Sequence, residues 1–270
     1  MPESLNEIVK KIKSLKIQGA KEIAVESLKF LRKFAKKKGF GKEFDKACKK
    51  LEEARPTAVV LHNCLIILKR DKEIKTINKL LRQLNEATKR IATRGGHLIK
   101  NDYTIMTHCH SGEAMAVIKQ AWKDKKKIYV YATETEPKEQ GIITAKELTK
   151  MGIPTILIVD SAIEFFIKEV DIVIVGADAI RKEGVVNKIG TYPMAVVAWE
   201  HKKPFYVVAN TLKLDRRKKL VIEERPASEV YRNGIAIRNP AFDVTPWKYI
   251  KRVVTEKGVL TSGNVLRMLK

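Results

Sequence analysis

Five short apolar runs in the second half of the chain constrain its fold more than any other feature. Residues 103–107, 128–132, 155–159, 171–175 and 205–209 read YTIMT, IYVYA, TILIV, DIVIV and FYVVA. Runs of this length are typical of strands that are buried on both faces. Helical segments such as GEAMAVIKQAWKD lie between most of them. The alternation predicts a doubly wound parallel sheet of the Rossmann type, although the GxGxxG dinucleotide fingerprint is absent from the sequence.

The first part of the chain has a different periodicity. Segments such as SLNEIVKKIKSL and AKEIAVESLKFLRKFAKK place apolar residues at intervals of three and four, which predicts amphipathic helices. The pattern continues as far as Gly95 and Gly96, a pair that favours the end of a helix. We therefore expect an α/β protein with a helical domain over residues 1–100 and a Rossmann-like domain over residues 101–270.

The chain is strongly basic. Its 54 lysine and arginine residues and 31 aspartate and glutamate residues give a formal net charge of +23. This charge fits a solvated lysine-rich surface, an electrostatic funnel for a small anion, or a nucleic-acid interface. No helix-turn-helix, zinc-finger or RNP motif accompanies it, so nucleic acid is the least favoured partner.

The N-terminal segment is charged and amphipathic and does not have the apolar centre of a signal peptide. No apolar run reaches the roughly 18 residues of a membrane span. The three cysteines are widely spaced and form no CxxC pair, which argues against a disulfide framework and a structural zinc site. We therefore expect a cytoplasmic protein without a membrane partner.

Polar residues follow each apolar run, at the sheet edge where parallel sheets bind ligands. His108, Cys109 and His110 follow the first run, just before a predicted helix that starts near Gly112. The positive end of a helix lowers a thiol pKa, so this position favours a reactive Cys109; the alternative is a small buried side chain. A metal site of these three residues is not expected, because neighbouring side chains in extended backbone point to opposite faces.

Two further positions carry chemistry in this pattern. Asp178 follows the most apolar run, where burial would raise its pKa and allow it to act as an acid near neutral pH, unless it only caps a turn. Asn187 and Lys188 precede Gly190, where a predicted helix start offers backbone N–H groups to a phosphate, unless the helix is simply capped. Lys213, after the last run, adds a second cation. Together these groups indicate a phosphorylated substrate.

These residues lie in motifs by which nearly the whole chain resembles a known superfamily. The motifs are IQGA (17–20), RPTAV (55–59), MTHCHS (106–111), TETEPKEQG (133–141), IVGAD (174–178), NKIGT (187–191), KPFYVVANTLK (203–213) and RNPAFDVTP (238–246). The superfamily contains methylthioribose-1-phosphate isomerases, archaeal ribose-1,5-bisphosphate isomerases and the alpha, beta and delta subunits of translation initiation factor 2B. MTHCHS and RNPAFDVTP look most like the ribose-1,5-bisphosphate isomerases.

The resemblance implies an aldose–ketose isomerase that converts ribose 1,5-bisphosphate into ribulose 1,5-bisphosphate in archaeal AMP metabolism. Cys109 would be the thiolate base at C2, and Asp178 would be the acid at the ring oxygen. Motif matches imply that the substrate is held by Gly19, Ala20, Arg55, Ser111, Gln140, Asn187, Lys188 and Lys213. No metal or other cofactor is implied. The resemblance also implies a homo-oligomer built from dimers and a nucleotide activator such as AMP.

Three departures from the family pattern keep other interpretations open. Gln18 and Glu136 stand where the family usually has arginine, and Gly112 with Glu113 stands where we expect a lysine. Lost cations weaken the binding of a bisphosphate. The main alternative is a regulatory subunit of the initiation factor 2B type, which binds a nucleotide or sugar phosphate without chemistry. Methylthioribose-1-phosphate isomerase is a third interpretation.

Overall fold

The computed structural model of the chain describes residues 4–14, 16–17, 19–232 and 234–270, so Gln18 lies outside the described residues. Two compact units, Met1–Ala87 and Thr88–Lys270, make up the chain. The division falls inside the long helix α5 (Ile74–Gly96), and the first strand begins at Tyr103. Within the described residues, no helix is both long enough and apolar enough to cross a membrane.

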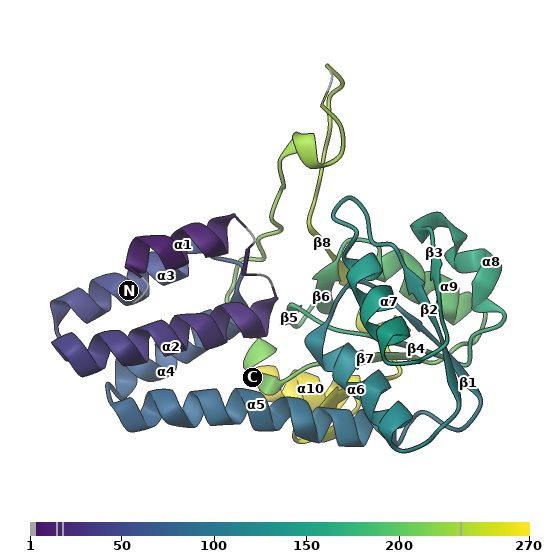
Figure 1. The fold of residues 1–270 in the computed structure, drawn as a ribbon, viewed down its shortest axis with the longest axis horizontal. Helices are drawn as coiled ribbons and strands as arrows, with labels where there is room; N and C mark the ends of the chain where they lie inside the picture. The colour runs from purple at the N-terminus through teal and green to yellow at the C-terminus, as the bar shows by residue number, and fades with distance from the viewer. Residues whose placement is uncertain (1–3, 15, 18, 233) are drawn as a thin grey trace. The chain divides into compact units, whose positions relative to one another are not determined.

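The first unit is built of helices, as the three- and four-residue spacing predicts (Figure 1). They are α1 (Leu5–Lys13), α2 (Ala20–Lys38), α3 (Lys42–Ala54), α4 (Val59–Arg70) and the first part of α5. Helix α1 starts at a capping box, in which the Ser4 hydroxyl accepts the Glu7 N–H and the Glu7 carboxylate accepts the Ser4 N–H. Helix α2 packs on α3 and α4 through its buried apolar stripe.

The second unit contains a seven-stranded sheet in the order β10-β9-β7-β4-β1-β2-β3. All neighbouring strands are parallel except β9 and β10. The strands are β1 (Tyr103–Thr107), β2 (Ile128–Thr133), β3 (Thr155–Ile158), β4 (Ile172–Val175), β7 (Phe205–Val208), β9 (Arg252–Thr255) and β10 (Gly258–Leu260). The five apolar runs correspond to β1, β2, β3, β4 and β7, which confirms the predicted α/β fold.

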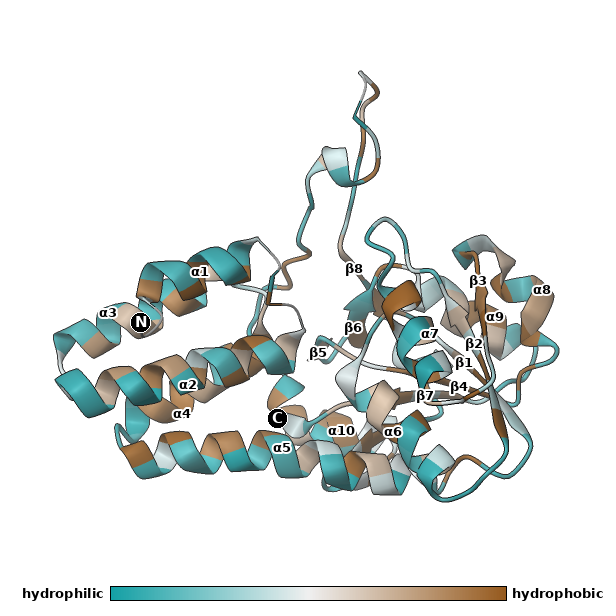
Figure 2. Cartoon of the chain, viewed as in Figure 1, coloured by the Kyte–Doolittle hydropathy of each residue, from teal (hydrophilic) through white to brown (hydrophobic). Residues whose placement is uncertain are grey.

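Helices cover both faces of this sheet. They are α6 (Gly112–Lys123), α7 (Gln140–Lys150), α8 (Ile163–Ile167), α9 (Thr191–Glu200) and α10 (Ser262–Leu269). Neighbouring residues of one strand enter different cores: Ile105 packs with Ile118 of α6, whereas Met106 packs with Met194 of α9. Burial on both faces explains why the central strands read as unbroken apolar runs, which appear brown in Figure 2.

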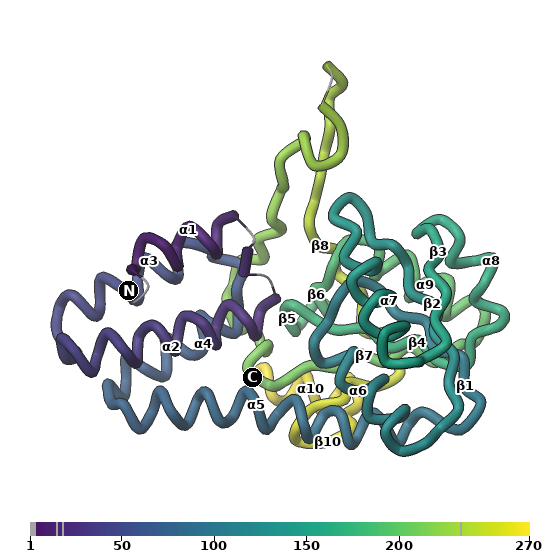
Figure 3. The backbone as a smooth tube through the Cα atoms, in the orientation of Figure 1, coloured from purple at the N-terminus to yellow at the C-terminus, as the bar shows by residue number. Residues whose placement is uncertain are grey.

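A second, three-stranded antiparallel sheet has the order β5-β6-β8. Its strands are β5 (Ala179–Ile180), β6 (Val185–Lys188) and β8 (Phe242–Thr245). The segment RNPAFDVTPWKYI looks like a loop in the sequence, but it contains β8 and the short 3-10 helix η4 (Trp247–Tyr249), so that prediction was wrong for these residues. The segment between β7 and β8 forms a long loop that projects away from the two sheets (Figure 3).

Candidate active site

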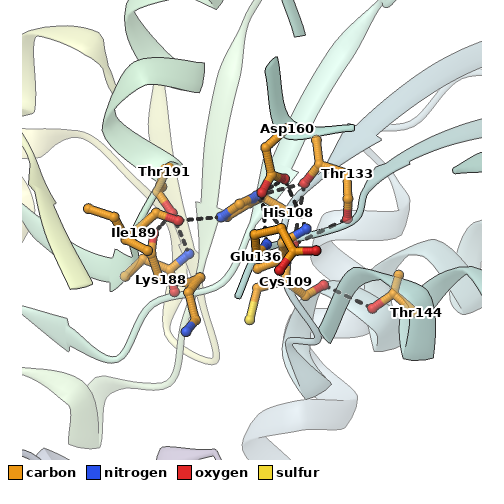
Figure 4. Close-up of polar contacts among 12 residues, drawn as sticks. His108, Cys109, Thr133, Glu136, Thr144, Asp160, Lys188, Ile189 and Thr191 are labelled. Carbon is orange, nitrogen blue, oxygen red and sulfur yellow. Dashed lines mark hydrogen bonds and ion pairs between the residues drawn. The ribbon is translucent and has the colours of Figure 1, made fainter. Parts of the chain in front are cut away.

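The site lies in the second unit, where polar residues follow the ends of β1, β2 and β6 (Figure 4). His108 and Cys109 come directly after β1, Thr135 follows β2, and Lys188 ends β6. In Figure 4 the sulfur of Cys109 and the ammonium of Lys188 point the same way. Strand-end placement is the feature that the sequence predicts, and it brings a thiol close to a cation.

The backbone of Cys109 is held in an unusual conformation. Its φ of 67° lies in the left-handed region, which a side chain with a Cβ rarely adopts. Two threonines hold it there. The Cys109 N–H donates to Thr135 Oγ1 over 2.9 Å, and the Thr144 hydroxyl donates to the Cys109 carbonyl over 2.9 Å. Such a conformation persists only where its surroundings fix it, and it is common at active sites.

The Cys109 thiol is protonated at rest. Burial raises its pKa to about 11, the Lys188 charge lowers it, and the Asp178 charge raises it. The prediction that the following helix would lower this pKa was therefore wrong. Helix α6 starts at Gly112 behind its Ser111 cap, and burial of the sulfur outweighs both the Lys188 charge and the His110 N–H, which lower the pKa.

His108 connects the loop after β1 to the turn after β6. Its Nε2 lies 2.8 Å from the Ile189 carbonyl oxygen, and its Nδ1 lies 2.6 Å from Thr133 Oγ1. A carbonyl only accepts, so Nε2 carries the proton. Burial lowers the His108 pKa, which keeps the ring neutral at neutral pH, so Nδ1 accepts the Thr133 hydroxyl.

Asp178 lies between β4 and β5, and Asn187 and Lys188 lie in β6. The Asp178 side chain is half-buried, and its backbone N–H donates to the Val186 carbonyl over 2.8 Å. Lys188 is buried, and its carbonyl accepts the Thr191 hydroxyl over 2.6 Å. Asn187 Nδ2 donates to the same hydroxyl over 3.0 Å. The pair ends strand β6, and helix α9 starts at Thr191 behind its Gly190 N-cap, where the sequence predicted a helix start.

The start of helix α9 is occupied by a carboxylate of the chain itself. Asp243 Oδ2, from β8, accepts the Gly190 N–H over 2.8 Å and the Tyr192 N–H over 3.0 Å. Burial raises the pKa of this carboxyl to about 6, against the three N–H groups that lower it. The prediction that these N–H groups hold a phosphate is therefore contradicted, because an internal anion already fills the helix terminus.

Lys213 has a buried partner that explains one departure from the family pattern. Its Nζ lies 3.1 Å from Glu113 Oε2, and both side chains are 4% exposed. Asn210 Nδ2 donates to the other Glu113 oxygen over 2.8 Å. Lys213 and Asn210 together hold the Glu113 pKa below its usual value despite burial. The Glu113 carboxylate thus neutralises the charge of Lys213 inside the protein.

The remaining predicted contacts differ in their surroundings. Gln140, at the start of α7, has a side-chain oxygen that is buried and has no hydrogen-bond partner among the described residues. Ser111 caps α6. Gly19 and Ala20 belong to the helical unit, at the start of α2, and Arg55 follows the end of α3 in the same unit.

The structure adds hydrogen-bonding residues around the site that sequence reasoning did not select. Thr133 and Thr135 carry a usable signal, since they follow an apolar run. Thr144 lies inside helix α7, and Asp243 lies in a segment that looks like a loop in the sequence, so no sequence signal marks either residue. Nowhere in the described part of the chain do three metal-binding side chains converge on a common point.

A model of the initiation factor 2 subunit family matches residues 16–262. The chain belongs to this family. Ribose 1,5-bisphosphate isomerase of Archaeoglobus fulgidus is 40% identical, over 96% of this chain and 90% of the relative. Methylthioribose-1-phosphate isomerase of Acetivibrio thermocellus is 37% identical, over 94% of this chain and 87% of the relative. These matches confirm the resemblance seen in the motifs.

The fold of the family is also found in solved structures. The crystal structure of translation initiation factor eIF-2B of Pyrococcus horikoshii matches with a TM-score of 0.89 at 31% identity, over 98% of this chain and 100% of that chain. The family therefore holds proteins named as isomerases and proteins named as translation factors on one architecture.

Proposed function

We propose that this chain is a sugar-phosphate isomerase that converts ribose 1,5-bisphosphate into ribulose 1,5-bisphosphate. One observation carries the proposal: the Cys109 thiol and the Lys188 ammonium point the same way at the strand ends, and the Asp178 charge acts on the same thiol, raising its pKa where Lys188 lowers it. A proton donor, a proton acceptor and a cation for phosphate are the groups that this isomerisation needs. Relatives named ribose 1,5-bisphosphate isomerase support the choice of sugar.

The chemistry begins with ring opening, because a phosphate on O1 prevents a free aldehyde. Protonated Asp178 gives its proton to the ring oxygen, and the bond between C1 and this oxygen breaks. The positive charge that develops at C1 makes the C2 proton more acidic. The Cys109 thiolate takes that proton, and the C2–H electron pair forms the C1–C2 double bond. Protonation of C1 and loss of the O2 proton then give the ketose.

Asp178 and Cys109 need only one proton between them. The reactive pair is a neutral Asp178 with a Cys109 thiolate, and the resting pair has the proton on sulfur. Moving this proton from sulfur to carboxylate changes one pair into the other without uptake from water. Because the Asp178 charge raises the thiol pKa, its neutralisation favours the thiolate, and Lys188 favours it further.

The substrate contacts follow from the same arrangement. Lys188 suits the phosphate next to C1, and the unpartnered Gln140 oxygen suits a sugar hydroxyl. Ser111, Asn187 and Lys213 are proposed as further contacts in this unit. Gly19, Ala20 and Arg55 are proposed contacts from the helical unit. A homo-oligomer built from dimers and activation by AMP remain part of the proposal.

The test is to incubate the purified chain with ribose 1,5-bisphosphate and to follow ribulose 1,5-bisphosphate by NMR, with methylthioribose 1-phosphate in parallel. We expect turnover of the bisphosphate. Cys109→Ser and Asp178→Asn should each lower kcat by about 10²-fold or more, the usual contribution of a general acid or base. Near-normal kcat in either variant would remove that residue from the mechanism. Turnover of methylthioribose 1-phosphate but not of the bisphosphate would show that the substrate is methylthioribose 1-phosphate.

A second candidate is a regulatory protein that binds a nucleotide or sugar phosphate without chemistry. The likeness to the translation factor structure favours it, as does Glu136, an exposed acid where the family usually has arginine; partial desolvation and nearby acids raise its pKa. In that case AMP or the bisphosphate would raise the Tm while the NMR spectrum of the sugar stays unchanged.

A further inference from the structure

His108 is the one histidine of the MTHCHS motif that is almost fully buried, and the proposed chemistry does not use it. The side chain is 1% exposed, and both ring nitrogens already have partners in the protein, so the ring has no nitrogen left to bind a substrate. It directly precedes Cys109, and its Nε2 bonds to the residue that directly follows Lys188. A single rigid ring thus separates the backbone that carries the thiol from the backbone that carries the cation.

The turn on the other side of the ring is fixed independently. Gly190 has a φ of +99°, and a Cβ at this position would lie 3.0 Å from His108 Cε1 and 3.1 Å from Nε2. Asp243 holds the same turn from its far side through the Gly190 and Tyr192 N–H groups. The turn after Lys188 is therefore held between the His108 ring and the Asp243 carboxylate.

The loop on the near side is fixed as well. Thr133 binds Nδ1 of His108, and Thr135 binds the Cys109 N–H. Asp160 in turn accepts the backbone N–H groups of Thr135 and Glu136, over 2.9 and 2.8 Å. Each side of the ring is thus held by its own part of the chain, and the bond from Nε2 to the Ile189 carbonyl joins the two sides.

We infer that His108 is a positioning residue whose bond to Ile189 sets the separation between the Cys109 thiol and the Lys188 ammonium. The inference rests on the proposed function, in which Lys188 holds the phosphate near C1 and Cys109 meets the C2 proton. Two neighbouring carbons require a fixed spacing between the groups that serve them. An aromatic ring supplies this spacing without the rotamer freedom of an aliphatic side chain.

Two amide variants separate this role from the alternatives. In His108→Gln the amide nitrogen reaches the place of Nε2 and keeps the bond to Ile189. In His108→Asn the amide reaches only the place of Nδ1, so the bond to Ile189 is lost while Thr133 keeps a partner. We expect His108→Gln to keep kcat within about threefold and His108→Asn to lose about 10²-fold with little change in KM, as a misplaced group does. Gly190→Ala, which pushes on the ring, should resemble His108→Asn.

Three results would overturn the inference. Equal losses of kcat in His108→Gln and His108→Asn would indicate a proton-transfer role, because neither amide titrates. Normal kcat in His108→Asn would show that the spacing does not matter. Losses of Tm without loss of kcat per folded molecule would indicate a purely structural residue.

A second measurement does not depend on turnover and so separates this inference from the proposed function. The apparent pKa of Cys109 is taken from the pH dependence of its alkylation, followed at this cysteine by mass spectrometry. Because Lys188 lowers the thiol pKa, His108→Asn should raise it, and His108→Gln should leave it unchanged. An unchanged value in His108→Asn would refute the positioning role even in a chain that isomerises no sugar.

Discussion

Replacement of Glu113 by Gln tests the buried pair that this chain has in place of the expected lysine. The Glu113 carboxylate and the Lys213 ammonium are 3.1 Å apart, and both side chains are 4% exposed. In Glu113→Gln the Lys213 charge would therefore be buried without a counterion. Removing one partner of a buried pair costs about 3–5 kcal/mol. Glutamine keeps the shape and can still accept the Asn210 bond, so we expect the lower end, about 3 kcal/mol.

In a chain of this size 1 kcal/mol shifts the Tm by about 2–4 °C, so Glu113→Gln should lower it by roughly 6–12 °C. Thermal unfolding by circular dichroism at neutral pH measures this. The matched control is Glu26→Gln, which removes an acid 2.7 Å from Lys29 in an exposed pair. It should cost less than about 1 kcal/mol.

The double variant Glu113→Leu, Lys213→Met completes the test. Replacing a whole buried pair by apolar residues is often neutral for stability, so its Tm should recover towards the value of the unchanged chain. A double variant as unstable as Glu113→Gln would mean that packing around Glu113, and not its charge, stabilises this region. Glu113→Gln and Glu26→Gln with equal Tm values would refute the reasoning from burial altogether.

Two further predictions concern the loops around the thiol. Gly141→Ala should lower the Tm strongly and abolish activity, because its Cβ would lie 1.6 Å from the Thr133 carbonyl oxygen. The control Gly263→Ala, whose Cβ would have its nearest atom 3.9 Å away, should leave the Tm unchanged. Equal Tm values in the two variants would contradict this. If one proton is exchanged between Asp178 and Cys109, kcat/KM should stay level between about pH 7 and about pH 9 and fall as the pH approaches the thiol pKa of about 11, because both groups then lack the proton. A rise of about tenfold per pH unit in this range would show that the thiolate is formed by loss of a proton to water.

The central sheet could be predicted because the strands at its centre, β1, β4 and β7, are largely buried on both faces. These strands carry no charged residues within them, and YTIMT coincides with β1 to the residue. The antiparallel sheet could not be predicted in the same way. Strand β5 has two residues, and β6 includes the polar Asn187 and Lys188, so neither shows a periodicity.

The candidate site was predictable in its location but not in its energetics. The rule that ligands bind after parallel strands selects Cys109 and Asp178 from sequence, and the predicted helix start near Gly190 selects Lys188. The thiol pKa depends on burial and on charges that come from distant parts of the chain, so a local helix argument gave the wrong direction. The use of Asp243 as the cap of α9 depends on a strand pairing some 50 residues away, which no local pattern contains.

The protonated resting state of Cys109 has a consequence for oxidative chemistry. Peroxides attack thiolates, and with a thiol pKa of about 11 only about one molecule in 10⁴ carries the thiolate at neutral pH. Cys48 and Cys64 are buried, and their pKa values are raised to about 12. In the proposed mechanism Cys109 becomes a thiolate only when Asp178 takes its proton, so the raised pKa would shield the thiol from conversion to sulfenic acid between turnovers.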